Sequence, residues 1–190
     1  MKKVGLLGGT FNPPHIAHLI MANEAYYALN LDEVRLMPNA IPPHKVKPED
    51  ATAEQRFHMT ELAAEMVPHF TVEPYEIKHG GVSYSYDTLR ALTALEPEVE
   101  FYFIIGGDMI DMLDEWYHIE ELTKLVHFVG VHRPGSVGST SLPVQKVEAP
   151  MVDLSSTMIR ERLHAGKPVT FIVPPAVEEY IRKEGLYGTK

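Results

Sequence analysis

The sequence GGTFNPPHIAH, residues 8–18, joins two apolar patterns of different period. Before it stands the run Val4-Gly5-Leu6-Leu7, which has the length of a buried strand. After it come Leu19, Ala22 and Tyr26, whose spacing is that of one helix face. We therefore expect a strand, a glycine turn and the start of a helix at this point of the chain.

The turn has the features of a phosphate site. Gly8 and Gly9 let the backbone turn sharply and approach a ligand closely, because no Cβ stands in the way. The helix that follows directs unpaired N–H groups and the positive end of its dipole into the turn, where an anion is stabilised. His15 and His18 share the first helical turn if His15 opens the helix. Ordinary surface histidines are the alternative, but the glycine pair and the two prolines favour phosphate binding.

Several familiar sites are excluded by pattern. The chain contains neither Gly-x-x-x-x-Gly-Lys-Ser/Thr nor Gly-x-Gly-x-x-Gly, so neither a Walker A loop nor the dinucleotide fingerprint is present. It has no cysteine and no His-Glu-x-x-His motif to complete a zinc site around the two histidines. We expect no structural metal centre.

Composition limits the class of protein. With 190 residues, of which 45% are hydrophobic, the chain fits one α/β domain with a sizeable core. Met1-Lys2-Lys3 runs directly into the first expected strand, which leaves no room for a signal peptide. No apolar run approaches the ~20 residues of a membrane span. The expectation is a cytoplasmic protein that binds no membrane.

The net charge of −9 argues against non-specific binding to nucleic acid, whose backbone demands a basic face. A small polyphosphate ligand needs only a few local cations. The candidates are His44-Lys45-Val46-Lys47 and His132-Arg133.

Strands and helices alternate along the chain, which predicts a doubly wound parallel sheet. Further strands are expected at 34–37, 70–73, 101–105 and 128–131, with one or two more between 144 and 154. Phe101–Ile105 is the most apolar run and is expected at the centre, whereas the run before Pro74 is expected near an edge. We expect one domain over residues 1–190, with a C-terminal helical portion from about 155.

Helices are expected from a capping box at Thr52 and Gln55, near Ser85–Asp87, around Ile119–Leu125, and after two later start signals. Those signals are Ser155-Ser156-Thr157 and Pro174-Pro175, the second ending at Gly185. The expected apolar faces include Met66, Leu95 and Leu125 as their last members.

Two glycine turns follow strands. The first strand ends at Gly8-Gly9, and the central one ends at Gly106-Gly107-Asp108. Ligands of doubly wound sheets bind at the carboxyl ends of the strands, where the strand order reverses. If these two strands are neighbours, both turns line one crevice.

Other residues have both a structural and a functional reading. Ser155-Ser156-Thr157 caps a helix, yet with Arg160 it also suits a polyphosphate, because guanidinium is a fork donor. Asp108 either caps a helix or meets a ribose hydroxyl or Mg²⁺. Trp116-Tyr117 is either core or a stacking surface for a heterocycle, and Asp87-Thr88 is either a cap or a carboxylate site.

Two motifs resemble the two-part signature of the nucleotidyltransferase superfamily of adenylyltransferases. They are Gly8-Gly9-Thr10-Phe11-x-Pro13-Pro14-His15-x-x-His18 and Ser155-Ser156-Thr157-x-Ile159-Arg160. The resemblance extends over nearly the whole chain and is strongest for bacterial nicotinate-nucleotide adenylyltransferases. Asn12 stands where that family commonly has Asp, and Ala17 where it commonly has Gly. Neither change removes a catalytic donor, but Ala17 is expected to tighten the space near the adenine.

The resemblance implies that ATP and nicotinate mononucleotide give nicotinate adenine dinucleotide and pyrophosphate in NAD biosynthesis, with Mg²⁺ accompanying ATP and no assigned protein ligand for the metal. By position it assigns catalysis to His15, His18 and Arg160, and ATP binding to Gly8, Gly9, Thr10, Phe11, Gly106, Asp108, Ser155, Ser156 and Thr157. It assigns the mononucleotide to Asn39, Lys45 and Arg133, and its pyridine ring and carboxylate to Thr88, Trp116 and Tyr117.

Alternatives stay open at this stage. The acceptor is otherwise nicotinamide mononucleotide or phosphopantetheine, although Trp116-Tyr117 favours a flat heterocycle. A non-catalytic nucleotide sensor and a histidine-dependent phosphohydrolase are candidates from other classes. By analogy with family members, a homodimer is expected.

Overall fold

The computed structural model describes residues 1–41, 51–132, 138–150 and 152–189. Within these residues, six strands form one parallel sheet in the order β3-β2-β1-β4-β5-β6. The strands are β1 (Lys2–Gly9), β2 (Glu33–Pro38), β3 (Phe70–Val72), β4 (Val99–Gly106), β5 (His127–His132) and β6 (Val144–Glu148). This order confirms the doubly wound sheet, and it reverses between β1 and β4.

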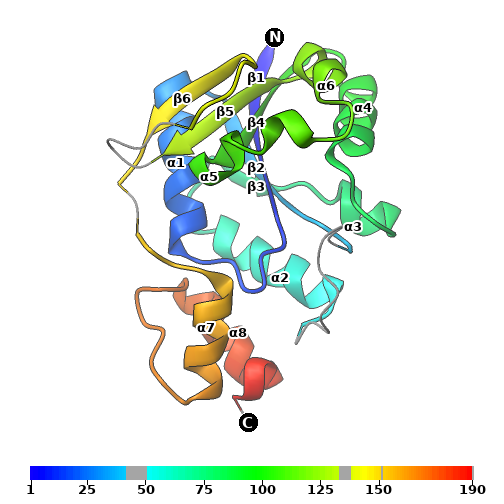
Figure 1. Cartoon of the computed structure of the whole chain (residues 1–190). Coiled ribbons are helices and arrows are strands. Elements are labelled where there is room, and N and C mark those ends of the chain that lie inside the picture. The colour runs from blue at the N-terminus through cyan, green and yellow to red at the C-terminus, as the bar shows by residue number, and fades with distance from the viewer. Residues whose placement is uncertain (42–50, 133–137, 151, 190) are drawn as a thin grey trace.

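The helices that precede β6 lie between strands in the chain, whereas the last two helices lie together at the C-terminal end (Figure 1). They are α1 (Ile16–Leu29), α2 (Ala53–Ala64), α3 (Tyr75–His79), α4 (Ser85–Leu95), α5 (Gly107–Ile110), α6 (Ile119–Leu125), α7 (Ser156–His164) and α8 (Pro175–Glu184). Two short 3₁₀ helices, η1 (Leu113–Glu115) and η2 (Leu186–Gly188), complete the described secondary structure.

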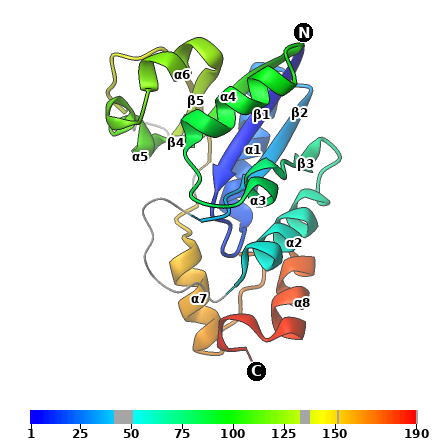
Figure 2. The same ribbon diagram turned by 90° about the vertical axis from the view of Figure 1, so that its right-hand side faces the viewer.

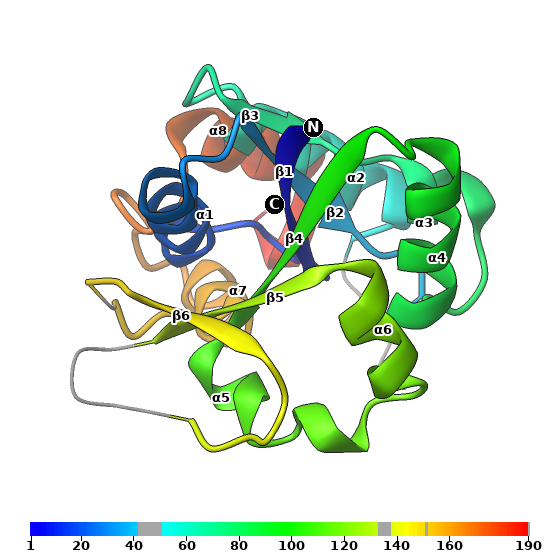
Figure 3. The same cartoon turned by 90° about the horizontal axis from the view of Figure 1, so that it is seen from above.

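The sheet has an apolar core on each face. Seen from above, α1 covers one face, and α4 and α6 cover the other (Figure 3). Successive residues of a strand point to opposite faces, so Leu7 and Ile104 join the core under α1, while Leu6 and Phe103 join the core under α4 and α6. Both faces of β4 are therefore buried, which explains why its sequence is an almost unbroken apolar run.

Short-range signals at the helix ends are confirmed. Thr52 caps α2, and the Thr52 and Gln55 side chains each accept a hydrogen bond from the other's backbone N–H. Ser155 caps α7 by accepting from the Met158 N–H at 3.1 Å. Gly185 ends α8 in the left-handed region, at φ 64°. These contacts are local, so sequence spacing was sufficient to predict them.

The expected apolar faces extend too far at their ends. Met66 lies beyond α2, while Leu95 and Leu125 are the last residues of α4 and α6, and all three side chains are exposed. The apolar periodicity continues to the end of each helix, but the core beneath the helix ends earlier, so the last apolar side chains are left exposed. The short helix α3 after Pro74 was not expected, because five residues are too few for a periodic pattern.

The last two helices lie beneath the carboxyl ends of the strands. Both side views place α7 and α8 below the sheet, on the side away from the N-terminus (Figures 1 and 2). Their apolar side chains, among them Ile159, Val177 and Ile181, belong to the same buried cluster as the α1 face. The C-terminal segment thus lies on the side of the sheet where ligands of this topology bind.

Among the described residues, no helix combines the length and the apolar character that crossing a membrane requires.

Candidate active site at the carboxyl edge of the sheet

The turn between β1 and α1 stacks the two histidines on each other. His15 is the N-cap of α1, with extended backbone angles, and its N–H donates to Nδ1 of His18 at 3.1 Å. The two rings are stacked with centroids 3.7 Å apart. Because Nδ1 of His18 accepts this bond, the proton of the neutral ring lies on Nε2. His18 therefore presents an N–H donor at the positive end of α1.

His15 is a buried and neutral imidazole. Its side chain is 4% exposed, and burial lowers its pKa from 6.5 to about 4. Its Nδ1 is buried and has no hydrogen-bond partner among the described residues. A buried polar atom left without a partner is costly, so this nitrogen is a candidate to bind a water, an ion or a ligand.

The lowered pKa of His15 predicts a loss of stability in acid. Between pH 6.5 and 4 the unfolded chain takes up a proton on this ring that the folded chain does not, so the free energy of unfolding falls as the pH falls. A shift from 6.5 to about 4 corresponds to about 3 kcal/mol. The measurement is urea unfolding between pH 7 and 4 for the wild type and His15→Asn, which keeps a good N-cap residue.

Over this range, the wild type should lose up to about 3 kcal/mol more than His15→Asn. Carboxylates titrate in both proteins, so the difference between the two curves isolates the histidine. Parallel curves would show that His15 is protonated as readily in the folded chain as in the unfolded one.

A cleft of about 620 Å³ opens beside these histidines. It is lined by the first turn of α1, including His15, Ala17 and His18, and by the β4–α5 turn at Gly106–Asp108. The end of β5 and residues 152–154 complete its wall. β1 and β4 are adjacent in the sheet, which meets the condition stated from the sequence, and the α1 start and the second glycine turn share one crevice.

Glycine is required in the second turn by close packing. A Cβ on Gly107 would lie 2.9 Å from Cβ of His132, which is closer than real Cβ atoms approach. The turn therefore lies directly against the end of β5. Gly8, Gly9, Thr10 and Phe11 border the α1 start but do not line the cleft itself, and the Phe11 ring is buried against His18 at 4.8 Å between centroids.

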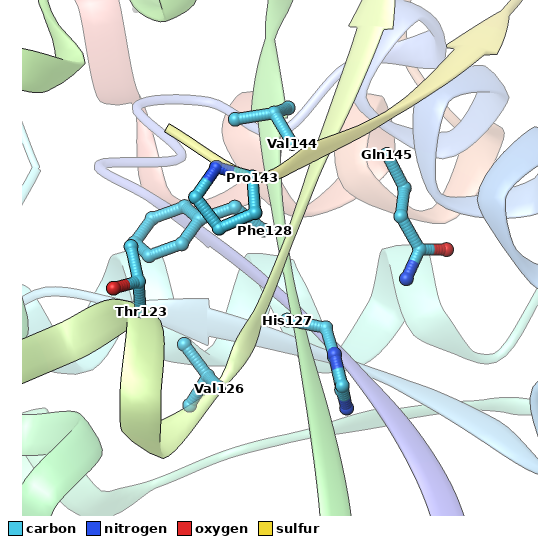
Figure 4. A pocket seen from close by; sticks show the side chains of 7 residues that line it. All are labelled: Thr123, Val126, His127, Phe128, Pro143, Val144 and Gln145. Carbon is cyan, nitrogen blue, oxygen red and sulfur yellow. The ribbon is translucent and has the colours of Figure 1, made fainter. Parts of the chain in front are cut away.

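A second, smaller pocket of about 210 Å³ lies at the amino ends of β5 and β6, and Figure 4 shows the side chains that line it. It is formed around His127 and Phe128 at the start of β5, and Val144 and Gln145 at the start of β6. Ligands of doubly wound sheets bind at the carboxyl ends of the strands, and these are amino ends. His127 is also already paired, with Glu100 at 2.7 Å. This pocket is not the candidate site.

The start of α7 is bonded to the loop ahead of α1. The Arg160 Nη1 donates to the Asn12 carbonyl at 2.7 Å, and the Ser156 hydroxyl donates to the Pro13 carbonyl at 2.9 Å. Nη2 of Arg160 donates to the Thr157 hydroxyl at 3.2 Å. Two helix starts from opposite ends of the sequence thus meet at one loop, beside the cleft that residues 152–154 line.

The Asn12 side chain is held from the C-terminal end of the chain. Its Oδ1 accepts a hydrogen bond from the hydroxyl of Tyr187, and both residues are buried. The loop that carries His15 is therefore fixed by three side chains beyond residue 155, namely Ser156, Arg160 and Tyr187.

Comparison with known proteins identifies the family. The family model described as cytidylyltransferase-like matches residues 6–162. A probable nicotinate-nucleotide adenylyltransferase of Geobacillus thermodenitrificans is 49% identical over 190 residues, which is 100% of this chain and 88% of that protein. One from Lactiplantibacillus plantarum is 49% identical over 186 residues, covering 98% of this chain and 88% of that protein.

The chain belongs to the nicotinate-nucleotide adenylyltransferase family. A solved structure with the same fold is the nicotinic acid mononucleotide adenylyltransferase of Plasmodium falciparum in complex with NaAD. Its TM-score is 0.81 at 19% identity, with 100% of this chain and 99% of that chain covered.

Of the residues that the adenylyltransferase resemblance assigns to the acceptor, Asn39 lies next to the turn that follows β1. The Asn39 side-chain amide donates to the Thr10 hydroxyl at 3.4 Å, which joins the acceptor side to the phosphate turn. The Ala40 N–H donates to the Ser83 hydroxyl at 3.3 Å, just ahead of α4. Lys45 and Arg133 lie outside the described residues.

The structure places Thr88 inside the fold. Thr88 is buried, its hydroxyl donates to Glu76 at 2.9 Å, and its N–H donates to the Tyr84 carbonyl at 3.2 Å, so both donors are used within the fold. Burial also raises the pKa of this Glu76. The N–H groups without a helical partner at the start of α4 are those of its first turn, Ser85 to Asp87.

Trp116 belongs largely to the core. Its ring packs edge-on against Phe103 and Phe128, with centroids 6.1 Å away in both cases, and is partly buried. Tyr117, by contrast, is exposed and lies beside Tyr86, 5.8 Å between centroids. Tyr117 therefore offers the larger accessible aromatic surface of this pair.

The cleft also contains two acidic residues to which the sequence assigned no role, and one histidine that it named only as a candidate cation. Asp111 and Asp153 line it with Asp108, and His132 closes it at the end of β5. The proximity of His132 to a strand end was a usable signal, and His132-Arg133 was indeed a candidate cation pair. No sequence pattern indicated a role for Asp153, because it neither directly follows a strand nor caps a helix.

Proposed function

We propose that this chain transfers the adenylyl group of ATP to nicotinate mononucleotide, releasing pyrophosphate and forming nicotinate adenine dinucleotide, a step of NAD biosynthesis. Membership of the family supports this reaction. The observation that carries the proposal is the meeting of the α1 and α7 starts at one loop beside the 620 Å³ cleft, with His15 and His18 in its wall. Helix starts, imidazoles and a guanidinium together suit a polyphosphate chain.

The reaction needs no side-chain nucleophile. An oxygen of the mononucleotide phosphate attacks the α-phosphorus of ATP, a new P–O bond forms, and the bond to the leaving pyrophosphate breaks. The second pKa of such a phosphate is about 6, so the attacking group is already ionised at pH 7. Catalysis then rests on alignment and on stabilising the charge that develops at the α-phosphate and the leaving group.

The histidines and Arg160 provide that stabilisation in this proposal. His18 donates from Nε2, as its bond from the His15 N–H requires. His15 binds as a neutral imidazole, which supplies a directed donor without adding a desolvated charge. Arg160 has N–H groups beyond the two used on Asn12 and Thr157, and the fork suits phosphate oxygens. The hydroxyls of Ser155 to Thr157 and the Gly106–Asp108 turn complete the ATP side.

The carboxylate of the acceptor is assigned to the first turn of α4 instead of Thr88. The amides of Ser85 to Asp87 stand at a helix start, where an anion is favoured, whereas the Thr88 donors are occupied. Tyr117 and the exposed part of Trp116 then border the pyridine ring. The homodimer expected from the resemblance stays a prediction.

In this proposal Mg²⁺ accompanies ATP. No group of three or more His, Asp or Glu side chains that could hold a metal occurs in the described ranges. Mg²⁺ commonly takes one or two carboxylates together with substrate phosphates and waters, and Asp108, Asp111 and Asp153 line the cleft as candidate carboxylates. The bound metal would neutralise charge on the phosphates.

The acceptor assay tests the proposal. Pyrophosphate release is measured with ATP, Mg²⁺ and, in turn, nicotinate mononucleotide, nicotinamide mononucleotide and phosphopantetheine. We expect kcat/KM for the nicotinate form to exceed that for the amide by about 10- to 100-fold, since hydrogen bonds to a charged group contribute about 1.5–3 kcal/mol.

The other outcomes distinguish the alternatives. Equal rates with the amide would contradict the nicotinate assignment. Release of orthophosphate would identify a phosphohydrolase, and ATP binding without turnover of any acceptor would identify a nucleotide sensor.

A further inference from the structure

Arg56 is the largest fully buried side chain of the described residues. It lies on α2 with an exposed fraction of 0%, on the same helix face as the buried Met59 and Ala63. A guanidinium stays charged at any pH compatible with folding, and taking it out of water costs several kcal/mol. Packing alone does not explain an arginine on this face, because an apolar side chain would fill the same space without that cost.

The guanidinium joins two loops. Its Nη1 donates to the Thr10 carbonyl at 2.8 Å and to the Asn39 Oδ1 at 3.4 Å, and its Nη2 donates to the Ala40 carbonyl at 2.8 Å. Thr10 follows β1 and Asn39-Ala40 follows β2, and these strands are neighbours in the sheet. One rigid fork thus sets the separation of two loops at the carboxyl edge.

The two loops serve different substrates in the proposed reaction. The Thr10 loop leads into His15 and His18 on the ATP side, whereas Asn39 is assigned to the mononucleotide. Asn39 also reaches the first loop directly, because its N–H donates to the Gly9 carbonyl at 3.1 Å. Arg56 therefore lies between the loop assigned to ATP and the loop assigned to the mononucleotide. In the proposed reaction the phosphate of the mononucleotide must meet the α-phosphate of ATP between these loops.

We propose that Arg56 is a positioning residue that aligns the ATP loop with the acceptor loop for in-line attack. This inference rests on the proposed function. Arg56 acts through Thr10, Asn39 and Ala40 and touches neither substrate. Misplacing reacting groups by about 1 Å costs about 100-fold in rate, while each substrate keeps most of its own contacts. The effect should fall on kcat and leave the separate affinities nearly intact.

The test uses Arg56→Lys, which keeps the charge but loses the fork, and Arg56→Gln, which removes the buried charge. For each variant, kcat is measured per folded enzyme, and Kd values are measured by titration with a non-hydrolysable ATP analogue and with nicotinate mononucleotide. We expect kcat to fall about 10- to 100-fold in both variants and each Kd to change less than about threefold.

Arg35→Lys is the matched control. Arg35 on β2 is also largely buried and donates to Glu33, Glu73 and Glu96, none of which lines the cleft. Its replacement should lower Tm and leave kcat unchanged. If Arg56 is only structural, its variants will behave like Arg35→Lys, and the proposal is overturned.

Arg56→Gln keeps the test decisive if Arg56→Lys fails to fold, because burying a neutral amide costs less than burying a charge. A Gln variant with wild-type kcat would overturn the inference. Failure of the proposed function looks different, because the wild type itself would then release no pyrophosphate with nicotinate mononucleotide.

Discussion

Replacing His18 by alanine is expected to lower kcat about 100-fold or more, the scale of losing one preorganised donor to developing charge. The ring is held by the His15 N–H on Nδ1 and by stacking at 3.7 Å, so its Nε2–H keeps one direction before substrate arrives. Steady-state pyrophosphate release at saturating ATP and nicotinate mononucleotide measures the effect. The KM for the mononucleotide should change little, because His18 lies on the ATP side.

His69→Ala is the matched control for this loss. His69 is also stacked on an aromatic ring, Tyr26 at 3.7 Å, and bonded to Asn23, but it lies outside the cleft. We expect its replacement to leave kcat unchanged. A His18→Ala variant with kcat within threefold of the wild type would remove His18 from charge stabilisation.

The second large effect is expected from Arg160→Ala, which should lower kcat/KM for ATP about 100-fold. This change removes a fork donor from the phosphate site and also releases the Asn12 carbonyl, which Arg160 holds at 2.7 Å. Both consequences act on the triphosphate, so the loss should appear with ATP and not in the affinity for the mononucleotide alone. Initial rates at varied ATP, with the acceptor saturating, give the measurement.

Arg162 offers a control on the same helix. It is half-buried and donates to the Pro168 carbonyl at 2.7 Å. Arg162→Ala should leave kcat/KM for ATP near the wild-type value. Equal losses in the two variants would mean that α7 contributes only through its stability, and that Arg160 does not serve the phosphate site.

The residues of the first turn could be predicted because their contacts are short in sequence. His15 and His18 stack across three positions, and Thr52 and Gln55 cap each other across three. Such pairs follow from helix geometry, so their spacing in the sequence is enough to predict them. The doubly wound parallel sheet followed from the alternation of elements, and the central place of β4 followed from its apolar character.

The burial of Thr88 and Trp116 could not be predicted from such short-range contacts. Thr88 contacts Glu76, which belongs to a helix too short to show a period. Trp116 packs against Phe103 and Phe128, which lie on two different strands, beyond the reach of a local pattern. Each residue has a plausible role on the surface and a plausible role inside. Burial selects between them, and burial depends on the whole fold.

Neighbouring residues were enough to specify the strand, turn and helix that open the chain, the doubly wound order of the sheet and the histidine pair at its edge. The pairing of Arg160 with Asn12, across 148 positions, and of Arg56 with Thr10, across 46, arose only from packing. The physical reason is that periodicity and capping act within a few residues. The partner of a buried charge is instead whichever distant oxygen the assembled elements bring within reach.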